Sequence, residues 1–399
     1  MSNPKRVLFA CELGASLTAL DRLLPIAAGM TAQGHTVSLV LRDPSLVADL
    51  AASQSWSLTV APAWRAAPPP GFLAVSYADV LLQCGYATPE TLRDLLAGWR
   101  QVFALGQPDL LIADFAPTAL LAARAVGLPA VVLGNGYTLP PATDPLPSLR
   151  PWEEIDPTRI AESEARVLAI VNPTLGAIGG APLTCLADLF QQTATQILCA
   201  FPELDHYPGR GDAAWFGEVF DAGTGQPPDW PTGSAERIYA RMDGRHPAFA
   251  GLIQALDRLG LPSIVEATRI SDELARVLCR PHVHVGIAPT DRAAALASCD
   301  FVVCQDIATV APALLATRPV LMMPWPVEQT MTLYRVAPQG LGHGVPPSAT
   351  ADDMEAALRR LLDDAACRQR AAAFARLYDG YTPEMAIEPA LAECLDLLA

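Results

Sequence analysis

The chain has 399 residues, of which 51% are hydrophobic and 17% are charged. This length exceeds what one hydrophobic core usually supports and predicts two domains, while the apolar content predicts sheets buried on both faces. The 27 basic and 42 acidic residues give a net charge of −15 and are scattered singly. The lack of a basic stripe argues against binding to nucleic acid or to an anionic membrane surface.

The first half of the chain alternates short apolar strands with helices. Strands are predicted near residues 7–10, 37–41, 58–60, 110–113 and 130–133. Turn residues precede the later strands, a pattern typical of a parallel sheet that is buried on both faces. We therefore expect a Rossmann-like first domain.

Two irregular, proline-rich segments, 62–71 and 134–147, follow predicted strands of this sheet. Loops that leave the carboxyl ends of parallel strands form the ligand crevice in such folds. Both segments are therefore candidate walls of a ligand site. For the first segment, a rigid connector without ligand contacts is an equal alternative.

The second half repeats the alternation after a segment rich in glycine and proline. Residues 153–192 are predicted to be mainly helical, with a break at 179–182 and a strand at 196–200. The repeat is predicted to contain helices 246–259, 272–279, 292–298, 309–316 and 352–379, strands 263–267, 283–287, 301–304 and 320–323, and a last helix at 384–398. We expect an N-terminal domain (1–204), a linker (205–235), a second Rossmann-like domain (236–380) and a closing helix (381–399).

Cysteine usage and hydropathy predict a soluble, cytoplasmic protein. The nine cysteines are odd in number and mostly lie in apolar runs such as 197–199 and 302–304, so we expect reduced thiols. No apolar run reaches about 18 residues, and the N-terminus lacks a signal-peptide pattern. His282 and His284 share one strand face without a second ligand pair, so no metal site is predicted.

Three motifs resemble those of GT-B glycosyltransferases of the UDP-glucuronosyl/UDP-glucosyltransferase (family 1) type. They are Glu12-Leu13-Gly14 with Arg22-Leu23-Leu24-Pro25, the loop 137–147, and Glu328-Gln329. The resemblance covers about residues 6–398. It implies an α/β GT-B fold, with two Rossmann-like domains facing across a cleft and a C-terminal helix that crosses back to the N-terminal domain. It also implies an inverting transferase that moves a sugar from a nucleotide-sugar co-substrate to a small-molecule acceptor without a cofactor.

The catalytic histidine that the resemblance implies is missing. In this family a histidine at the mouth of the cleft removes a proton from the acceptor hydroxyl, and Ala19 stands at that position. The segment 108–117 resembles the one that carries the acidic partner of this histidine, Asp114. Asp114 is therefore the candidate base, with Glu12 as a second carboxylate. An equal alternative is that Asp114 caps the helix that begins near Pro117.

The glycine-rich phosphate loop of the family is also altered. Glycines and a helix N-terminus let such a loop bind a diphosphate, but this chain has Cys304-Gln305-Asp306-Ile307-Ala308-Thr309. Either Cys304 or Gln305 stands at the position of the phosphate-binding histidine. Asp306 repels a diphosphate, because two like charges about 4 Å apart cost on the order of 4 kcal/mol at an effective dielectric near 20. Gln305 and Thr309 are candidate donor-binding residues, although Thr309 is equally a plain helix cap.

The remaining site residues also come from the resemblance. Glu328 and Gln329 match the acid and amide that bind the hydroxyls of the donor sugar, although an acidic residue is favoured at a helix start by the dipole alone. On the acceptor side, the resemblance implies Gly14, Asn135 and Tyr137.

Three functions stay open at this point. The first is a glycosyltransferase that uses Asp114 or Glu12 as base. The second is a non-catalytic relative that binds a small molecule or a partner glycosyltransferase, and the third is a repurposed enzyme whose ligand lacks a diphosphate. The transferase is placed first because the fold carries that expectation, although the lost histidine and glycines argue against ordinary donor use.

Overall fold

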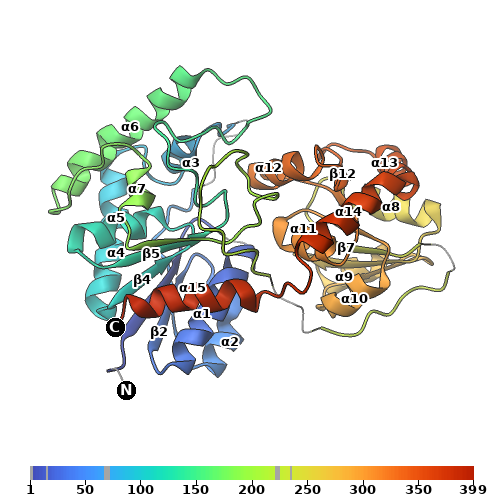
Figure 1. The fold of residues 1–399 in the computed structure, drawn as a ribbon, viewed down its shortest axis with the longest axis horizontal. Helices are drawn as coiled ribbons and strands as arrows, with labels where there is room; N and C mark the ends of the chain where they lie inside the picture. The colour runs from blue at the N-terminus through green and yellow to red at the C-terminus, as the bar shows by residue number, and fades with distance from the viewer. Residues whose placement is uncertain (1–2, 15–16, 67–71, 221–224, 234–235) are drawn as a thin grey trace. The chain divides into compact units, whose positions relative to one another are not determined.

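The computed structural model describes residues 3–14, 17–66, 72–220, 225–233 and 236–399. The chain divides into two compact units, Met1–Val219 with Pro383–Ala399, and Phe220–Thr382. Each unit is a parallel sheet flanked by helices (Figure 1), so the prediction of two Rossmann-like domains is confirmed. Within the described ranges, no helix is long and apolar enough to cross a membrane.

The first unit is built on six parallel strands in the order β3-β2-β1-β4-β5-β6. The strands are β1 (Arg6–Cys11), β2 (Thr36–Leu41), β3 (Ser57–Val60), β4 (Leu110–Ala113), β5 (Ala130–Gly134) and β6 (Thr195–Leu198). Every residue of β4 and β5 is buried, as expected for a sheet covered on both faces. Because the strand order reverses between β1 and β4, the carboxyl ends of these two strands flank the position where such sheets bind ligands.

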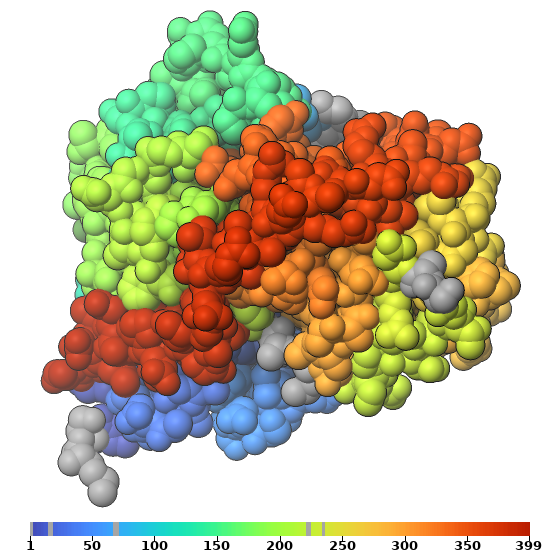
Figure 2. Space-filling view, turned by 45° about the vertical axis from the view of Figure 1, so that its right-hand side comes forward, coloured from blue at the N-terminus to red at the C-terminus, as the bar shows by residue number. Residues whose placement is uncertain are grey.

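The helices of the first unit cover both faces of this sheet. They are α1 (Leu17–Ala32), the 3-10 helix η1 (Pro44–Val47), α2 (Ala48–Ser53), α3 (Tyr77–Gln83), α4 (Pro89–Gly106), α5 (Pro117–Val126), α6 (Pro157–Gly176), α7 (Asp188–Gln191) and α15 (Glu384–Asp396). The final helix α15 packs on α1 so closely that a Cβ at Gly29 would lie 2.5 Å from Leu391 Cδ2. Figure 2 shows the last residues, in dark red, on the N-terminal part of the chain, in blue. The prediction that this helix returns to the first domain is confirmed.

The second unit contains six parallel strands in the order β12-β11-β10-β7-β8-β9. The strands are β7 (Ile238–Asp243), β8 (Ser263–Thr268), β9 (Val283–Gly286), β10 (Phe301–Cys304), β11 (Val320–Met322) and β12 (Gly342–Gly344). The helices are α8 (Phe249–Leu259), α9 (Asp272–Leu278), α10 (Arg292–Ser298), α11 (Ile307–Leu315), α12 (Val327–Val336), α13 (Ala351–Asp363) and α14 (Ala365–Leu377). Strand β12 was not predicted, because its sequence Gly-His-Gly carries no apolar run.

Two segments differ from the sequence prediction. The predicted continuous helix 352–379 is broken at Asp364, whose carboxylate accepts a hydrogen bond from Cys367 N at 2.8 Å and begins α14. Asp205 and Tyr207, which were predicted to lie in the linker, are buried in the first unit. At Asp364 a side-chain contact, rather than residue propensity, decides where the helix begins.

Candidate functional site

Asp114 follows β4 directly, at the carboxyl edge of the first sheet, and its side chain is fully buried. Arg22 of α1 donates a hydrogen bond from Nε to Asp114 Oδ2 at 2.8 Å. Burial raises the pKa of Asp114, and attraction to Arg22 opposes this shift. The alternative role of Asp114 as the cap of α5 is wrong, because the residue at the N-cap position is Ala116 and makes no side-chain cap.

Glu12 follows β1 and takes the capping role at α5. Its Oε1 accepts a hydrogen bond from Thr118 N at 2.6 Å, in the first turn of α5, and its Oε2 accepts one from Trp99 Nε1 at 2.7 Å. A carboxylate at this end of a helix is favoured by the unpaired N–H groups and by the dipole. Burial raises the pKa of Glu12 to about 7. Both carboxylate oxygens therefore serve contacts inside the first unit.

The acceptor-side candidates Gly14, Asn135 and Tyr137 meet at the same edge of the sheet. Asn135 Oδ1 accepts hydrogen bonds from Tyr137 N and from Thr138 N, both at 3.1 Å, so this residue forms the turn after β5. The Tyr137 ring packs edge-on against Phe115, with ring centroids 5.6 Å apart. A Cβ at Gly14 would lie 3.9 Å from the ring of Phe115 and 3.0 Å from Cys11 Sγ.

Phe115 lies among these candidate residues, and the sequence did not single it out. Its φ of 51° is uncommon for a bulky side chain, and such backbone strain concentrates at functional sites. The carbonyl of Phe115 accepts a hydrogen bond from Leu13 N at 3.1 Å. This bond joins the turns after β1 and β4, and nothing in the sequence around Phe115 signals the left-handed backbone.

Four exposed apolar side chains come from the end of β3 and from the segment between β3 and α3. Val60, Trp64, Phe72 and Leu73 are 52%, 37%, 38% and 50% exposed, and we call them the apolar rim. Arg42 anchors this segment, because its Nη1 donates to the carbonyl oxygens of Trp64 at 3.1 Å and of Glu12 at 3.2 Å. Apolar groups that gather at an exposed edge mark ligand or partner sites. The predicted crevice wall 62–71 lies partly outside the described residues, at 67–71.

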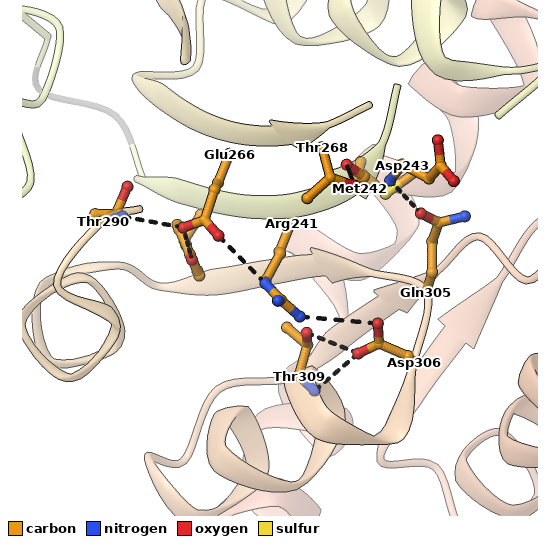
Figure 3. A network of polar contacts seen from close by, with 10 residues as sticks. Arg241, Met242, Asp243, Glu266, Thr268, Thr290, Gln305, Asp306 and Thr309 are labelled. Carbon is orange, nitrogen blue, oxygen red and sulfur yellow. Dashed lines mark hydrogen bonds and ion pairs between the residues drawn. The ribbon is translucent and has the colours of Figure 1, made fainter. Parts of the chain in front are cut away.

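In the second unit, Asp306 occupies the N-terminus of α11 (Figure 3). Its Oδ1 accepts hydrogen bonds from Thr309 N at 3.1 Å and from Thr309 Oγ1 at 2.9 Å. Its Oδ2 lies 3.8 Å from Arg241 Nη1. The hydroxyl of Thr309, a candidate donor-binding group, therefore donates to a carboxylate of this chain at the place where a helix N-terminus would bind a phosphate.

Gln305 is also engaged within the second unit. Cys304 is the last residue of β10, so Gln305 is the first residue of the turn, and its Oε1 accepts a hydrogen bond from Asp243 N at 2.5 Å. Next to it, Arg241 Nε donates to Glu266 Oε1 at 3.3 Å, and Glu266 Oε2 accepts from Thr290 N at 3.1 Å (Figure 3). Sequence reasoning missed Arg241 and Glu266. Charged residues inside two apolar strands were the available signal, and the strand register places them side by side.

Glu328 and Gln329 lie in the first turn of α12, as predicted. Gln329 Oε1 accepts a hydrogen bond from Trp325 N at 3.0 Å, and Glu328 is half-buried. The exposed indole of Trp325 packs edge-on against His246, with ring centroids 5.9 Å apart. The amide of Gln329 therefore supports the turn that presents Trp325.

The described part of the chain offers no metal site at these residues, and two open cavities lie elsewhere. Among the residues that the structure describes, no three His, Cys, Asp or Glu side chains are grouped to hold a metal ion. Two open cavities of about 640 and 420 Å³ share Leu128 and Pro129, at the amino end of β5. They lie at the opposite edge of the first sheet from Asp114.

The sequence matches no protein-family model and no curated protein. The structure is similar to that of CalG4, the calicheamicin glycosyltransferase, with 19% identity, 98% of each chain covered and a TM-score of 0.69. It is also similar to the glycosyltransferase of kitacinnamycin (18%, 100% of each chain, 0.67). For the spinosyn rhamnosyltransferase SpnG complexed with thymidine diphosphate the identity is 17%, the coverage 99% of this chain and 100% of that chain, and the TM-score 0.65. At these identities the likeness establishes the architecture, and the chain has the GT-B fold that its resemblance to nucleotide-sugar glycosyltransferases predicted.

Proposed function

We propose that this chain is a GT-B protein that binds a small apolar molecule on its first domain and does not transfer sugar from a nucleoside-diphosphate donor. The observation that carries this proposal is the Asp306 carboxylate at the N-terminus of α11. It uses the N–H and hydroxyl of Thr309 that a phosphate would need, and it adds a negative charge where a diphosphate would bring more.

The first domain supports the binding of an apolar ligand. The apolar rim begins at the last residue of β3, Phe115 follows β4 and Tyr137 follows β5. All of these groups therefore lie at the carboxyl edge of the first sheet. Ligands of parallel sheets bind at this edge, and pockets for small molecules are lined mainly by apolar and aromatic groups. SpnG, one of the similar structures, has been solved with spinosyn aglycone.

A second candidate function is glycosyl transfer with Asp114 as base. Burial raises the pKa of Asp114, against the opposing effects of Arg22 and Thr138, and a carboxylate base requires a raised pKa. In this reading Glu12 is the second carboxylate, and Glu328 and Gln329 bind the sugar. The full burial of Asp114 opposes this role, because an acceptor hydroxyl must approach a base to hydrogen-bond distance.

A titration separates the two candidates. The wild-type protein is titrated by calorimetry with thymidine diphosphate, uridine diphosphate and their glucose conjugates, and by fluorescence with the apolar dye anilinonaphthalene sulfonate. We expect binding of the dye but not of the nucleotides. Transfer of glucose to a phenolic acceptor, abolished in Asp114→Asn, would establish the second candidate instead.

The place of dye binding is tested by a matched pair of variants. Trp64→Ala removes a ring of the apolar rim and should weaken dye binding about tenfold. Leu105→Ala removes an exposed side chain at the end of α4, 80% exposed, and should leave dye binding unchanged. The opposite pattern would move the ligand site away from the rim, and dye binding that ignores both variants would contradict the proposal.

A further inference from the structure

Two buried carboxylates bind backbone N–H groups, one just after the apolar rim and one within the 134–149 segment. Asp79 of α3 accepts a hydrogen bond from Val75 N at 2.9 Å through Oδ2. Glu164 of α6 accepts one from Leu146 N at 2.7 Å through Oε1, and this side chain is only 3% exposed. A buried N–H that loses its acceptor costs free energy, so each carboxylate fixes the loop that it binds.

The two loops are also tied to each other. The carbonyl of Val75 accepts hydrogen bonds from Leu149 N at 2.9 Å and from Ser148 Oγ at 3.1 Å. Ser163, next to Glu164 on α6, donates from its hydroxyl to Asp79 Oδ1 at 2.8 Å. We call this set of contacts the Val75 clasp; it consists of Val75, Asp79, Leu146, Ser148, Leu149, Ser163 and Glu164.

The clasp borders the proposed ligand site through the chain itself. Phe72 and Leu73 of the apolar rim precede Val75 by three and two residues, and the 144–149 segment continues from the turn that carries Tyr137. Helices α3 and α6, which supply the carboxylates, pack on each other (Figure 1). A change in the clasp therefore acts on both segments that present apolar groups.

We infer that Glu164 is a positioning residue: through the Val75 clasp, its carboxyl group sets the conformation of the 144–149 segment and with it the affinity of the apolar rim for a ligand. This inference rests on the proposed function, because it assigns the clasp to the same site. Glu164 touches no reacting atom and acts through the backbone of Leu146.

The stability of the closed clasp depends on pH through the protonation of Glu164. Burial raises the pKa of Glu164 to about 7, the hydrogen bond from Leu146 opposes the shift, and the nearby charge of Asp144 adds to it. With the clasp open, the carboxyl group would meet water and titrate near its ordinary value. At pH values between the ordinary pKa of the carboxyl group and about 7, closing the clasp therefore binds a proton to Glu164. The clasp is tightest in mild acid and loosens as the pH rises through about 7. The neutral carboxyl group keeps its carbonyl oxygen as an acceptor for Leu146 N.

Other charged groups surround α6, and their positions bear on the same titration. Arg159 of α6 lies 3.7 Å from Asp79 across the clasp. The packed elements and α6 itself carry the charged residues Asp79 on α3, Glu90, Arg93, Asp94 and Arg100 on α4, Asp144 on the loop, and Arg159, Glu162 and Arg166 on α6. Asp144 is the charged group that acts on the pKa of Glu164.

Amide hydrogen exchange tests the clasp without any ligand. The protection factor of the Leu146 amide, corrected for intrinsic exchange, is measured between pH 5.5 and 8.5. We expect it to fall about tenfold in the wild-type protein, to stay constant in Glu164→Gln, which is neutral and keeps the acceptor, and to be lost at all pH values in Glu164→Ala. Glu162→Gln, an exposed neighbour on α6, is the control and should follow the wild type.

The binding of anilinonaphthalene sulfonate is measured on the same variants. We expect the affinity of the wild type to fall over this pH range and that of Glu164→Gln to stay constant. A flat protection factor in the wild type, or an equal fall in Glu164→Gln, overturns the role of Glu164 and leaves the proposed function intact. If amide exchange follows the expected pattern but the wild type and Glu164→Gln bind the dye with the same pH dependence, the clasp does not position the ligand site. Dye binding that is insensitive to Trp64→Ala instead contradicts the proposed function alone.

Discussion

Arg22 Nε lies 2.8 Å from Asp114 Oδ2, and the two side chains are 2% and 0% exposed. This ion pair joins α1 to the end of β4. The resemblance to family 1 glycosyltransferases predicted that Asp114 matches a carboxylate that partners a histidine, with Ala19 at the position of that histidine. In this structure the partner of Asp114 is an arginine.

Breaking this pair from one side should destabilise the first domain strongly. Arg22→Met leaves a buried carboxylate without its counter-charge, which costs about 3–5 kcal/mol. The double variant Arg22→Met with Asp114→Asn removes both charges and should recover part of that loss. Urea denaturation of the four proteins measures the coupling. Strictly additive effects would show that the pair makes no net interaction.

Asp306 should stabilise α11 through its capping hydrogen bonds and not through its charge. Asn caps a helix about as well as Asp, whereas Ala costs about 1 kcal/mol. We therefore expect Asp306→Asn to keep the stability of the protein and Asp306→Ala to lose about that amount.

Restoring the phosphate loop should recover nucleotide binding. Asp306→Gly removes the carboxylate, and Gln305→His adds a side chain that can donate a hydrogen bond to a phosphate. Because a like-charge repulsion of several kcal/mol is removed, the affinity for thymidine diphosphate should rise at least about tenfold. Calorimetric titration of the double variant against the wild type measures the gain. An unchanged affinity would mean that more than the loop chemistry has been lost.

Gly136 is required by close packing and not by backbone conformation. A Cβ there would lie within 3.1 Å of Asp205 Cγ and closer still to Oδ1, and Asp205 pairs with Arg210 at 2.7 Å. Gly136→Ala should therefore cost about 1–3 kcal/mol, as overpacking does. Gly176→Ala, at the end of α6 with no atom within 4 Å of the added Cβ, should be neutral or stabilising by up to about 1 kcal/mol. Thermal melts compare the two variants, and equal losses would contradict this assignment.

The stability of the protein should fall as the pH rises through neutrality. Burial raises the pKa values of Glu12 and Glu164 to about 7, so the folded state holds protons that the unfolded chain has already released. Their contribution is complete near their ordinary pKa and is lost as the pH rises through about 7; for Glu12 this is roughly 3 kcal/mol. Denaturation between pH 5 and 8 measures the slope. Glu12→Gln should flatten it, and an unchanged slope in that variant would exclude Glu12 as a source.

Much of the architecture was determined by the sequence, because it follows from local patterns. The strands predicted at 110–113 and 301–304 are observed at Leu110–Ala113 and Phe301–Cys304, since apolar runs between turn residues act within a few positions. The absence of a histidine at Ala19 and of glycines at 304–309 was read from residue identity alone, and its meaning for activity stays a prediction.

The tertiary structure alone decided which groups meet. Asp114 was predicted to be a base or a helix cap. It does not cap α5, and it pairs with Arg22, 92 positions away, while Glu12 binds the first turn of α5 through Thr118, 106 positions away. Arg241 and Glu266 become neighbours only through the register of β7 and β8. A sequence specifies which groups can form an ion pair or a cap. The choice of partner depends on how distant strands and helices pack, and here that packing pairs Asp114 with Arg22 and Glu12 with the first turn of α5.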